Sequence, residues 1–440
     1  MKPAGRGAVV VRRERDRGRP LPATNLDAVS QPRPTAYLDH AATTPMSAAA
    51  IEAMTAQFAR VGNASSLHAS GRRARRVVEE SREQIADVLA ARPSEVVFTS
   101  GGTEADNLAV KGTYWARHAD NPARVRVIAS RVEHHAVLDA VRWLGDFAGA
   151  EVEWAGVDSH GRIDLAEVTE RIERGPGGPD SVALVTCMWA NNEVGTVQPI
   201  ADLADLASRF GIPAHSDAVQ AVGQLPALFD QVSLASMAVT GHKLGGPVGV
   251  GALLLRRDVA LVPLTHGGGQ ERDVRSGTLD VPAIAGFATA LAETVASRDA
   301  HAARMRDLTT RLIEGVKAIA PDVRIGGDPD PAGRLPALAH LTFPGCEADS
   351  LLLLLDAAGV ECSTGSACSA GVPLASHVLL AMGYDERTAR SALRFSVGAT
   401  SRASDVDRLL DVLPEALERA QAAGRVGDGL SKLASVQEAG

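Results

Sequence analysis

The segment LASMAVTGHKLGGP, residues 234–247, decides the fold. An apolar run leads into Thr-Gly-His-Lys, and glycines and a proline follow. This order is typical of a buried strand that ends in a tight loop carrying one lysine, Lys243. An amine held at the end of a strand suits Schiff-base chemistry with an aldehyde. A surface lysine in a glycine-rich turn gives the same local pattern, so the interpretation depends on the rest of the chain.

Strand and helix patterns alternate on both sides of this segment. Strands that alternate with helices indicate an α/β domain with a mostly parallel sheet. The run at residues 181–189 is apolar almost throughout, as expected for a strand covered on both faces. The predicted strands are residues 95–99, 124–130, 151–157, 181–189, 212–218, 234–239 and 250–257.

Polar residues follow several of these strands directly. In such sheets, ligands bind beyond the carboxyl ends of the strands. Core packing gives no reason for polar residues to gather at one end of a sheet, so their recurrence predicts a binding site there. The residues are Thr103, His134, Asn192, Asp217 and Lys243.

A phosphate-binding turn is predicted at residues 100–103, Ser-Gly-Gly-Thr, between a strand and a helix. Glycines let the backbone approach an anion, and the helix dipole favours negative charge at the helix start. Glu104 and Asp106 also suit a first helical turn without any ligand, because helix caps use the same residue types. The turn alone therefore leaves both interpretations open.

Composition sets the class of protein. The chain has 440 residues, 45% of them hydrophobic and 22% charged, and a formal net charge of −8, so neither nucleic acid nor an anionic membrane is indicated as a partner. Its four cysteines form no Cys-x-x-Cys pair, which gives no sign of a disulfide framework or a metal site. We find no apolar run long enough for a membrane span and no signal peptide, and expect a cytoplasmic protein.

Changes in sequence texture predict the domain organisation. The arginine-rich start has little periodicity, which favours a disordered basic tail, with a nucleic-acid-binding arm as the alternative. From about residue 282 the strand–helix alternation gives way to long helices and a few strands. We predict a disordered tail at 1–34, a segment at 35–50 associated with the small domain, a large cofactor-binding domain at 51–285, a small α+β domain at 286–425 and a frayed tail at 426–440.

The polar residues also match the needs of a pyridine-aldehyde cofactor, which requires an amine, an acid against the ring nitrogen and donors for a phosphate. Lys243 supplies the amine, and Asp217 pairs with the ring nitrogen. Each has a simpler explanation alone, since an Asp after a strand can cap a helix. The phosphate is assigned to Gly102, Thr103, Thr240 and His242. The ring hydroxyl is assigned to Gln220 and the ring face to His134.

Ten motifs occur in order between residues 36 and 415: YLDHAATTP, GNASSLHASGR, VVFTSGGTEADNLAVKG, VEHHAVLD, WANNEVGTVQPI, HSDAVQAVGQLP, TGHKLGGPVGVGALLLRR, HGGGQERDVRSGT, CSTGSACSAG and SALRFSVG. Together they resemble group I (NifS/IscS-like) cysteine desulfurases, in the class V aminotransferase family of PLP fold type I. The resemblance implies a large domain with a mostly parallel seven-stranded sheet and a smaller α+β C-terminal domain. It also implies pyridoxal 5'-phosphate (PLP) as cofactor, L-cysteine as substrate and a homodimer.

The resemblance assigns further roles. Lys243 becomes the PLP lysine, and Asn192 and Gln220 the groups around the ring hydroxyl and the substrate. Thr278 becomes a phosphate ligand donated by the other subunit. Arg394 resembles the arginine that binds the substrate carboxylate, for which its bidentate fork is suited.

The reaction is indicated by Cys368 in the stretch GSACSAG, residues 365–371. Small neighbours predict a mobile loop, although free cysteines are also common as buried apolar residues. By the resemblance, the Cys368 thiolate takes sulfur from L-cysteine as a persulfide, L-alanine leaves, and the sulfur passes to an acceptor for Fe–S cluster assembly or tRNA thiolation. Cys362 receives no role. The following GVPLASHVL departs from many relatives at Leu374 and Ala375.

Three alternatives remain at this point. One is a related PLP enzyme, such as a selenocysteine lyase or an aminotransferase. A second is a non-catalytic sulfur-relay scaffold, against which the intact Lys243, His134, Asp217 and Cys368 argue. The third is a nucleic-acid binder that uses the basic tail.

Overall fold

The computed structural model describes the backbone of residues 35–365 and 375–438, and side chains as far as residue 423. Residues from Thr35 onward form one compact unit. The basic tail at 1–34 and Cys368 therefore lie outside the described residues, and what the sequence predicts for them stays a prediction.

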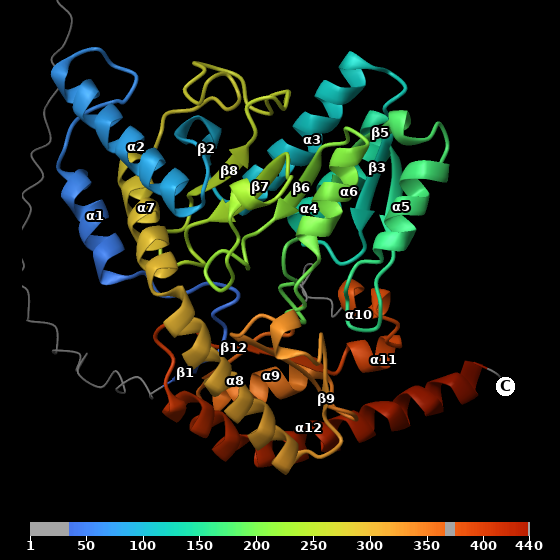
Figure 1. Ribbon diagram of the computed structural model, residues 1–440. Coiled ribbons are helices and arrows are strands. Elements are labelled where there is room, and N and C mark those ends of the chain that lie inside the picture. The colour runs from blue at the N-terminus through green and yellow to red at the C-terminus, as the bar shows by residue number, and fades with distance from the viewer. Residues whose placement is uncertain (1–34, 366–374, 439–440) are drawn as a thin grey trace, which may run out of the picture. The chain divides into compact units, whose positions relative to one another are not determined.

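The main sheet has seven strands in the order β2-β8-β7-β6-β5-β3-β4 (Figure 1). Neighbouring strands are parallel except at β8, which runs antiparallel to β2 and β7. The mostly parallel seven-stranded sheet expected from the resemblance is thus confirmed. The strands are β2 (Val96–Thr99), β3 (Arg126–Ser130), β4 (Glu151–Ala155), β5 (Val182–Thr186), β6 (Ala214–Asp217), β7 (Ser236–Thr240) and β8 (Gly251–Leu255).

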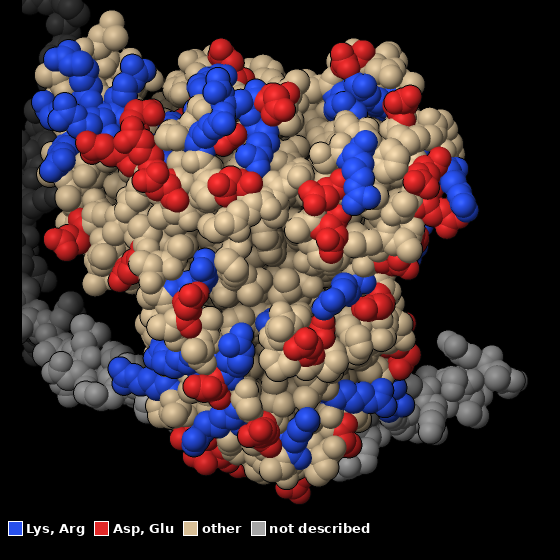
Figure 2. Space-filling view, in the orientation of Figure 1, with Lys and Arg blue, Asp and Glu red and all other residues tan. Residues whose placement is uncertain are grey.

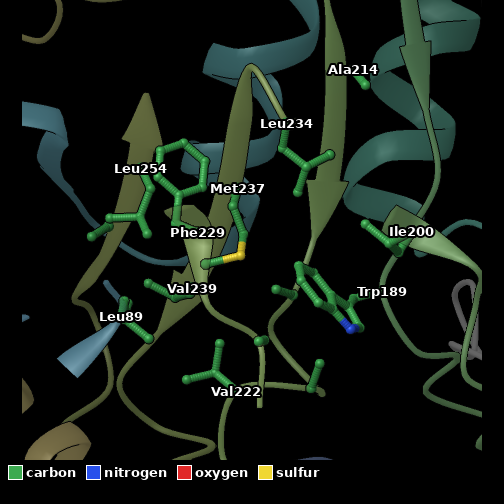
Figure 3. Packing of buried hydrophobic residues seen from close by; sticks show 14 of the residues in the cluster. Leu89, Trp189, Ile200, Ala214, Val222, Phe229, Leu234, Met237, Val239 and Leu254 are labelled. Carbon is green, nitrogen blue, oxygen red and sulfur yellow. The ribbon is translucent and has the colours of Figure 1, made fainter. Parts of the chain in front are cut away.

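Helices cover both faces of this sheet because successive strand side chains point to opposite sides. In β2, Val96 and Phe98 pack in the largest apolar cluster, which also holds side chains of α2, α5, α6 and α7, whereas Val97 packs against α3. Figure 3 shows the larger cluster around Met237 and Trp189. The helices are α1 (Ala48–Phe58), α2 (Ala69–Val88), α3 (Gly102–Asp120), α4 (His135–Ala148), α5 (Leu165–Arg174), α6 (Ile200–Arg209) and α7 (Val281–Ala296).

A second apolar core belongs to the C-terminal part of the chain. It contains Leu312, Leu341, Phe395 and Leu409, and the N-terminal residue Leu38 joins it. Its sheet is antiparallel, in the order β12-β10-β9. The elements are α8 (Arg298–Ile319), β9 (Arg324–Ile325), β10 (Leu338–Thr342), α9 (Ala348–Ala357), α10 (His377–Ala381), α11 (Glu386–Ala389), β12 (Ala392–Ser396) and α12 (Ala403–Glu438).

The N-terminal segment pairs with this C-terminal part, since β1 (Ala36–Tyr37) runs parallel to β11 (Val360–Glu361). At the other end, the backbone of α12 continues to Glu438, where the sequence predicted a frayed tail from residue 426. The domain boundaries themselves stay predictions.

Charge on the described surface is mixed. Figure 2 shows Lys and Arg interspersed with Asp and Glu over the face in view. The first turns of α2 expose four arginines, Arg72, Arg73, Arg75 and Arg76. In the described part of the chain, no helix has both the length and the apolar character that crossing a membrane requires.

Candidate active site

One pocket, with a volume of about 70 Å³, lies beyond the carboxyl ends of β6 and β7. It brings together nine of the residues that the sequence singled out for a cofactor. They are Gly102, Thr103, His134, Asn192, Asp217, Gln220, Thr240, His242 and Lys243. Lys243 and Gln220 also border a second cavity of about 280 Å³.

The start of α3 fits an anion. Gly101 precedes the helix with φ +150°. Because this N-cap residue has no side chain, it does not cap the first N–H groups of the helix. At Gly102, an added Cβ would lie 2.8 Å from Val219 Cγ2, so a larger residue would have to displace that side chain. Free N–H groups and the positive end of a helix dipole together suit a phosphate.

Lys243 follows β7 through the turn at Gly241, whose N–H donates to Val250 O (3.0 Å). Burial lowers the pKa of Lys243 to about 8, the nearby Asp217 opposes this shift, and Arg394 adds to it. A lysine with a lowered pKa is more often in the neutral form that attacks an aldehyde.

Asp217 ends β6, and its Oδ1 accepts a hydrogen bond from the N–H of Val219 (2.8 Å). Gln220 follows in the same turn, and its Nε2 donates to Ala41 O (2.8 Å). The N-terminal segment thereby fixes the amide of Gln220 at the rim of the pocket.

His134 is the N-cap of α4, and its Nδ1 accepts a hydrogen bond from Ala136 N–H (3.2 Å). This contact assigns the ring proton to Nε2 in the neutral form. Burial lowers the pKa of His134, which favours that form. Burial also lowers the pKa of His242, to about 4, and the charge of Lys243 adds to the effect. Both rings are therefore neutral at physiological pH.

Local sequence patterns missed three buried groups beside Asp217. Asp106 Oδ1 lies 3.2 Å from His215 Nε2, and His215 Nδ1 lies 2.9 Å from Ser236 Oγ. Glu133 Oε1 accepts from Thr186 Oγ1 (3.0 Å). In the sequence, Asp106 is an acidic residue near the start of a predicted helix. A favourable interaction with the helix dipole already explained an acid at that place, so no further role was assigned to it.

Burial determines the charge of these groups. It raises the pKa of Glu133 to about 8 and that of Asp106 well above its ordinary value, and in both cases Asp217 adds to the shift. Burial also lowers the pKa of His215 to about 3. The raised pKa values favour the protonated forms of Glu133 and Asp106, and the lowered pKa favours the neutral imidazole of His215.

Arg394 lies in β12 outside this pocket, but reaches its edge. Its Nη1 donates to the backbone oxygen of Asn192 (2.9 Å), and its Nη2 to Asp39 Oδ1 (2.8 Å). Thr278 is exposed and does not line the pocket of its own chain. Cys368 lies outside the described residues. The roles predicted for these three residues stay predictions.

A family model described as "Aminotransferase class-V" matches residues 36–409. An "IscS-like cysteine desulfurase" of Mycobacterium tuberculosis is 58% identical over 397 residues, which is 90% of this chain and 100% of the relative. The chain belongs to the class-V aminotransferase family, in its NifS/IscS-like group. The family predicted from the motifs is thus confirmed.

Other proteins similar to this chain agree with it in sequence or in fold. "Cysteine desulfurase IscS" of Methanosarcina thermophila is 38% identical, over 89% of this chain and 94% of the relative. A solved "NIFS-LIKE PROTEIN" is 32% identical with a TM-score of 0.79, over 87% of this chain and 99% of that one. "SspA in complex with cysteine" is 32% identical with a TM-score of 0.69, over 84% and 100%.

Proposed function

We propose that the protein is a PLP-dependent cysteine desulfurase, which converts L-cysteine into L-alanine and holds the removed sulfur as a persulfide on Cys368. The observation that carries the proposal is one pocket that combines Lys243, Asp217 and the open start of α3. Lysine, carboxylate and anion site are the three groups that PLP requires of a protein.

The residues present fit PLP. Gly102, Thr103, Thr240 and His242 would hold its phosphate, and Asp217 would face its ring nitrogen. When bound, PLP supplies an electron sink for the negative charge that develops on the substrate carbons.

The chain's own groups then handle protons and position the substrate. Lys243 accepts and returns a proton at Nζ, for which a pKa of about 8 is suitable. Neutral His134 holds its proton at Nε2, where it can donate a hydrogen bond into the pocket, since its Nδ1 accepts from Ala136 N–H. Arg394 binds the substrate carboxylate, and its hydrogen bond to Asn192 O places it at the pocket edge.

Sulfur transfer balances without an external oxidant. The Sγ of Cys368, as thiolate, bonds to the substrate sulfur while the substrate Cβ–S bond breaks. The electron pair of that bond stays on carbon, which is protonated to the methyl group of L-alanine. The enzyme thiol plus L-cysteine therefore give an enzyme persulfide plus L-alanine.

The three other cysteines are poor nucleophiles. Burial raises the pKa of Cys362 to about 12 and that of Cys346 to about 11, and it also raises that of Cys187. The thiolate is the reactive form, so these thiols are inert at neutral pH. Their inertness supports Cys368 as the sulfur acceptor.

We propose a homodimer in which Thr278 reaches the partner's phosphate site. Thr278 is exposed, and several large apolar side chains are exposed on α1 and on the loops after α1 and after Lys243. Exposed apolar groups of this size are typical of an interface. They are Ile51, Phe58, Val61, Leu67 and Val248.

The proposed sulfur acceptor is a protein of Fe–S cluster assembly or of tRNA thiolation. The IscS names of the relatives support the first of these. The proposed location is the cytoplasm, where reducing conditions keep free cysteine and the Cys368 thiol reduced.

The test is an absorbance spectrum of the purified PLP-loaded protein before and after L-cysteine is added, with alanine and sulfide measured in the same sample under a reductant. We expect a spectral change and equal amounts of both products. A spectral change without alanine would contradict desulfuration. Faster turnover of L-selenocysteine than of L-cysteine would favour a selenocysteine lyase instead.

A further inference from the structure

The arginine assigned to the substrate carboxylate already holds a carboxylate of its own chain. Arg394 Nη2 donates to Asp39 Oδ1 at 2.8 Å, and Nη1 donates to Asn192 O at 2.9 Å. Arg394 Nε is buried and has no hydrogen-bond partner among the described residues. A bidentate grip on a substrate carboxylate uses at least one Nη group, and both Nη groups already donate a hydrogen bond within the chain.

Hydrogen bonds of the neighbouring residues fix the backbone at Asp39. The segment around it runs beside β12, where Ser396 N–H donates to Leu38 O (2.7 Å) and Ala41 N–H donates to Ser396 Oγ (2.8 Å). The hydroxyl of Tyr37 donates to Asp39 O (3.1 Å). These contacts hold the backbone at Asp39, and its side chain is the part that meets the arginine.

Charge explains the pairing. The Arg394 side chain is 5% exposed, and a buried cation without a partner of opposite charge destabilises the fold. Asp39 supplies the opposite charge while no ligand is bound. Its own side chain is 20% exposed, so it can turn toward water when another carboxylate takes its place.

We propose that Asp39 is an internal substitute for the substrate carboxylate: it pairs with Arg394 in the free enzyme and gives way to the α-carboxylate of the amino acid. The proposal rests on the proposed function for the identity of that amino acid. Each binding event then exchanges one ion pair for another. Substrate and product are both held more weakly than a free arginine would hold them, and L-alanine leaves readily.

The variants separate the charge of Asp39 from its position. Asp39→Asn removes the charge and keeps an oxygen that can accept from Nη2, whereas Asp39→Glu keeps the charge. Asp407→Asn is the matched control, because it neutralises the partner of another arginine, Arg311, in a pair between α8 and α12.

Binding is measured on the PLP-loaded enzyme by calorimetry with propionate, a carboxylate without an amine, and by spectral titration with L-alanine. For Asp39→Asn we expect the dissociation constants of both ligands to fall about tenfold, the typical scale for a hydrogen bond to a charged group. The KM for L-cysteine falls with them, while kcat does not rise. Asp407→Asn stays near wild type, and Asp39→Glu, which keeps the charge, should show no such gain in affinity.

Unchanged or weaker binding of propionate and L-alanine in Asp39→Asn, at a melting temperature close to wild type, would overturn the exchange. If the variant does not fold, a crystal structure of the wild type with L-alanine decides. Asp39 still paired with Arg394 in that complex would also overturn it. Failure of the proposed function can be told apart from failure of the exchange. If the wild type makes no alanine from cysteine, its binding of propionate can still be measured.

Discussion

The pKa of Lys243 predicts how cofactor attachment depends on pH. Burial lowers that pKa from 10.5 to about 8, against the opposing charge of Asp217. Only the neutral amine attacks an aldehyde, and the neutral form predominates above the pKa. At pH 7, about one lysine in ten is neutral for a pKa of 8, against about one in three thousand for a pKa of 10.5, a difference of roughly 300-fold.

The assay mixes PLP-free enzyme with PLP between about pH 6 and pH 10 and follows the visible absorbance. We expect the rate of attachment to rise about tenfold per pH unit and to level off near pH 8, whereas a free lysine derivative continues to rise beyond pH 10. Lys243→Ala should give no attachment, which shows that the signal belongs to this residue. A wild-type rate that rises steadily to pH 10, or that does not vary with pH, would refute the reasoning.

Two further substitutions test the groups beside Lys243. Asp217→Asn should keep PLP bound but lower turnover by about two orders of magnitude, since a neutral amide no longer keeps the ring nitrogen protonated; near wild-type turnover at full PLP occupancy excludes that role. The raised pKa of Glu133, about 8, means that the folded PLP-free protein holds a proton that the unfolded chain loses above its ordinary pKa of 4.5. Its stability should therefore fall as the pH rises from about 4.5 to 8, and Glu133→Gln should lessen that fall; melting curves with the same pH dependence in both proteins would argue against a buried neutral acid.

Sequence alone predicted the framework of the site because that information is local. A strand followed by Gly-Gly-Thr and a helix marks the start of α3, and an apolar run followed by Gly-His-Lys marks the end of β7. In a parallel sheet such ends meet at one edge, so the separate signals predicted one pocket.

The contacts beneath and beside the pocket could not be predicted in this way. Asp39 and Arg394 lie 355 residues apart and meet only because the N-terminal segment runs beside β12. Glu133 adjoins His134 in the chain, but it hydrogen-bonds to Thr186 on a neighbouring strand. Such pairings depend on strand order, which local patterns do not specify. The roles of Thr278, Arg394 and Cys368 came from the family resemblance alone.

The central claim is tested most directly by locating the persulfide. Wild type, Cys368→Ala and Cys362→Ala are treated with L-cysteine, the persulfide is trapped with an alkylating agent, and the modified residue is identified by mass spectrometry. We expect the label on Cys368 in wild type and in Cys362→Ala. Cys368→Ala should still bind PLP and change its spectrum with L-cysteine, but form neither persulfide nor alanine. A label on Cys362, or alanine released by Cys368→Ala at the wild-type rate, would contradict the assignment.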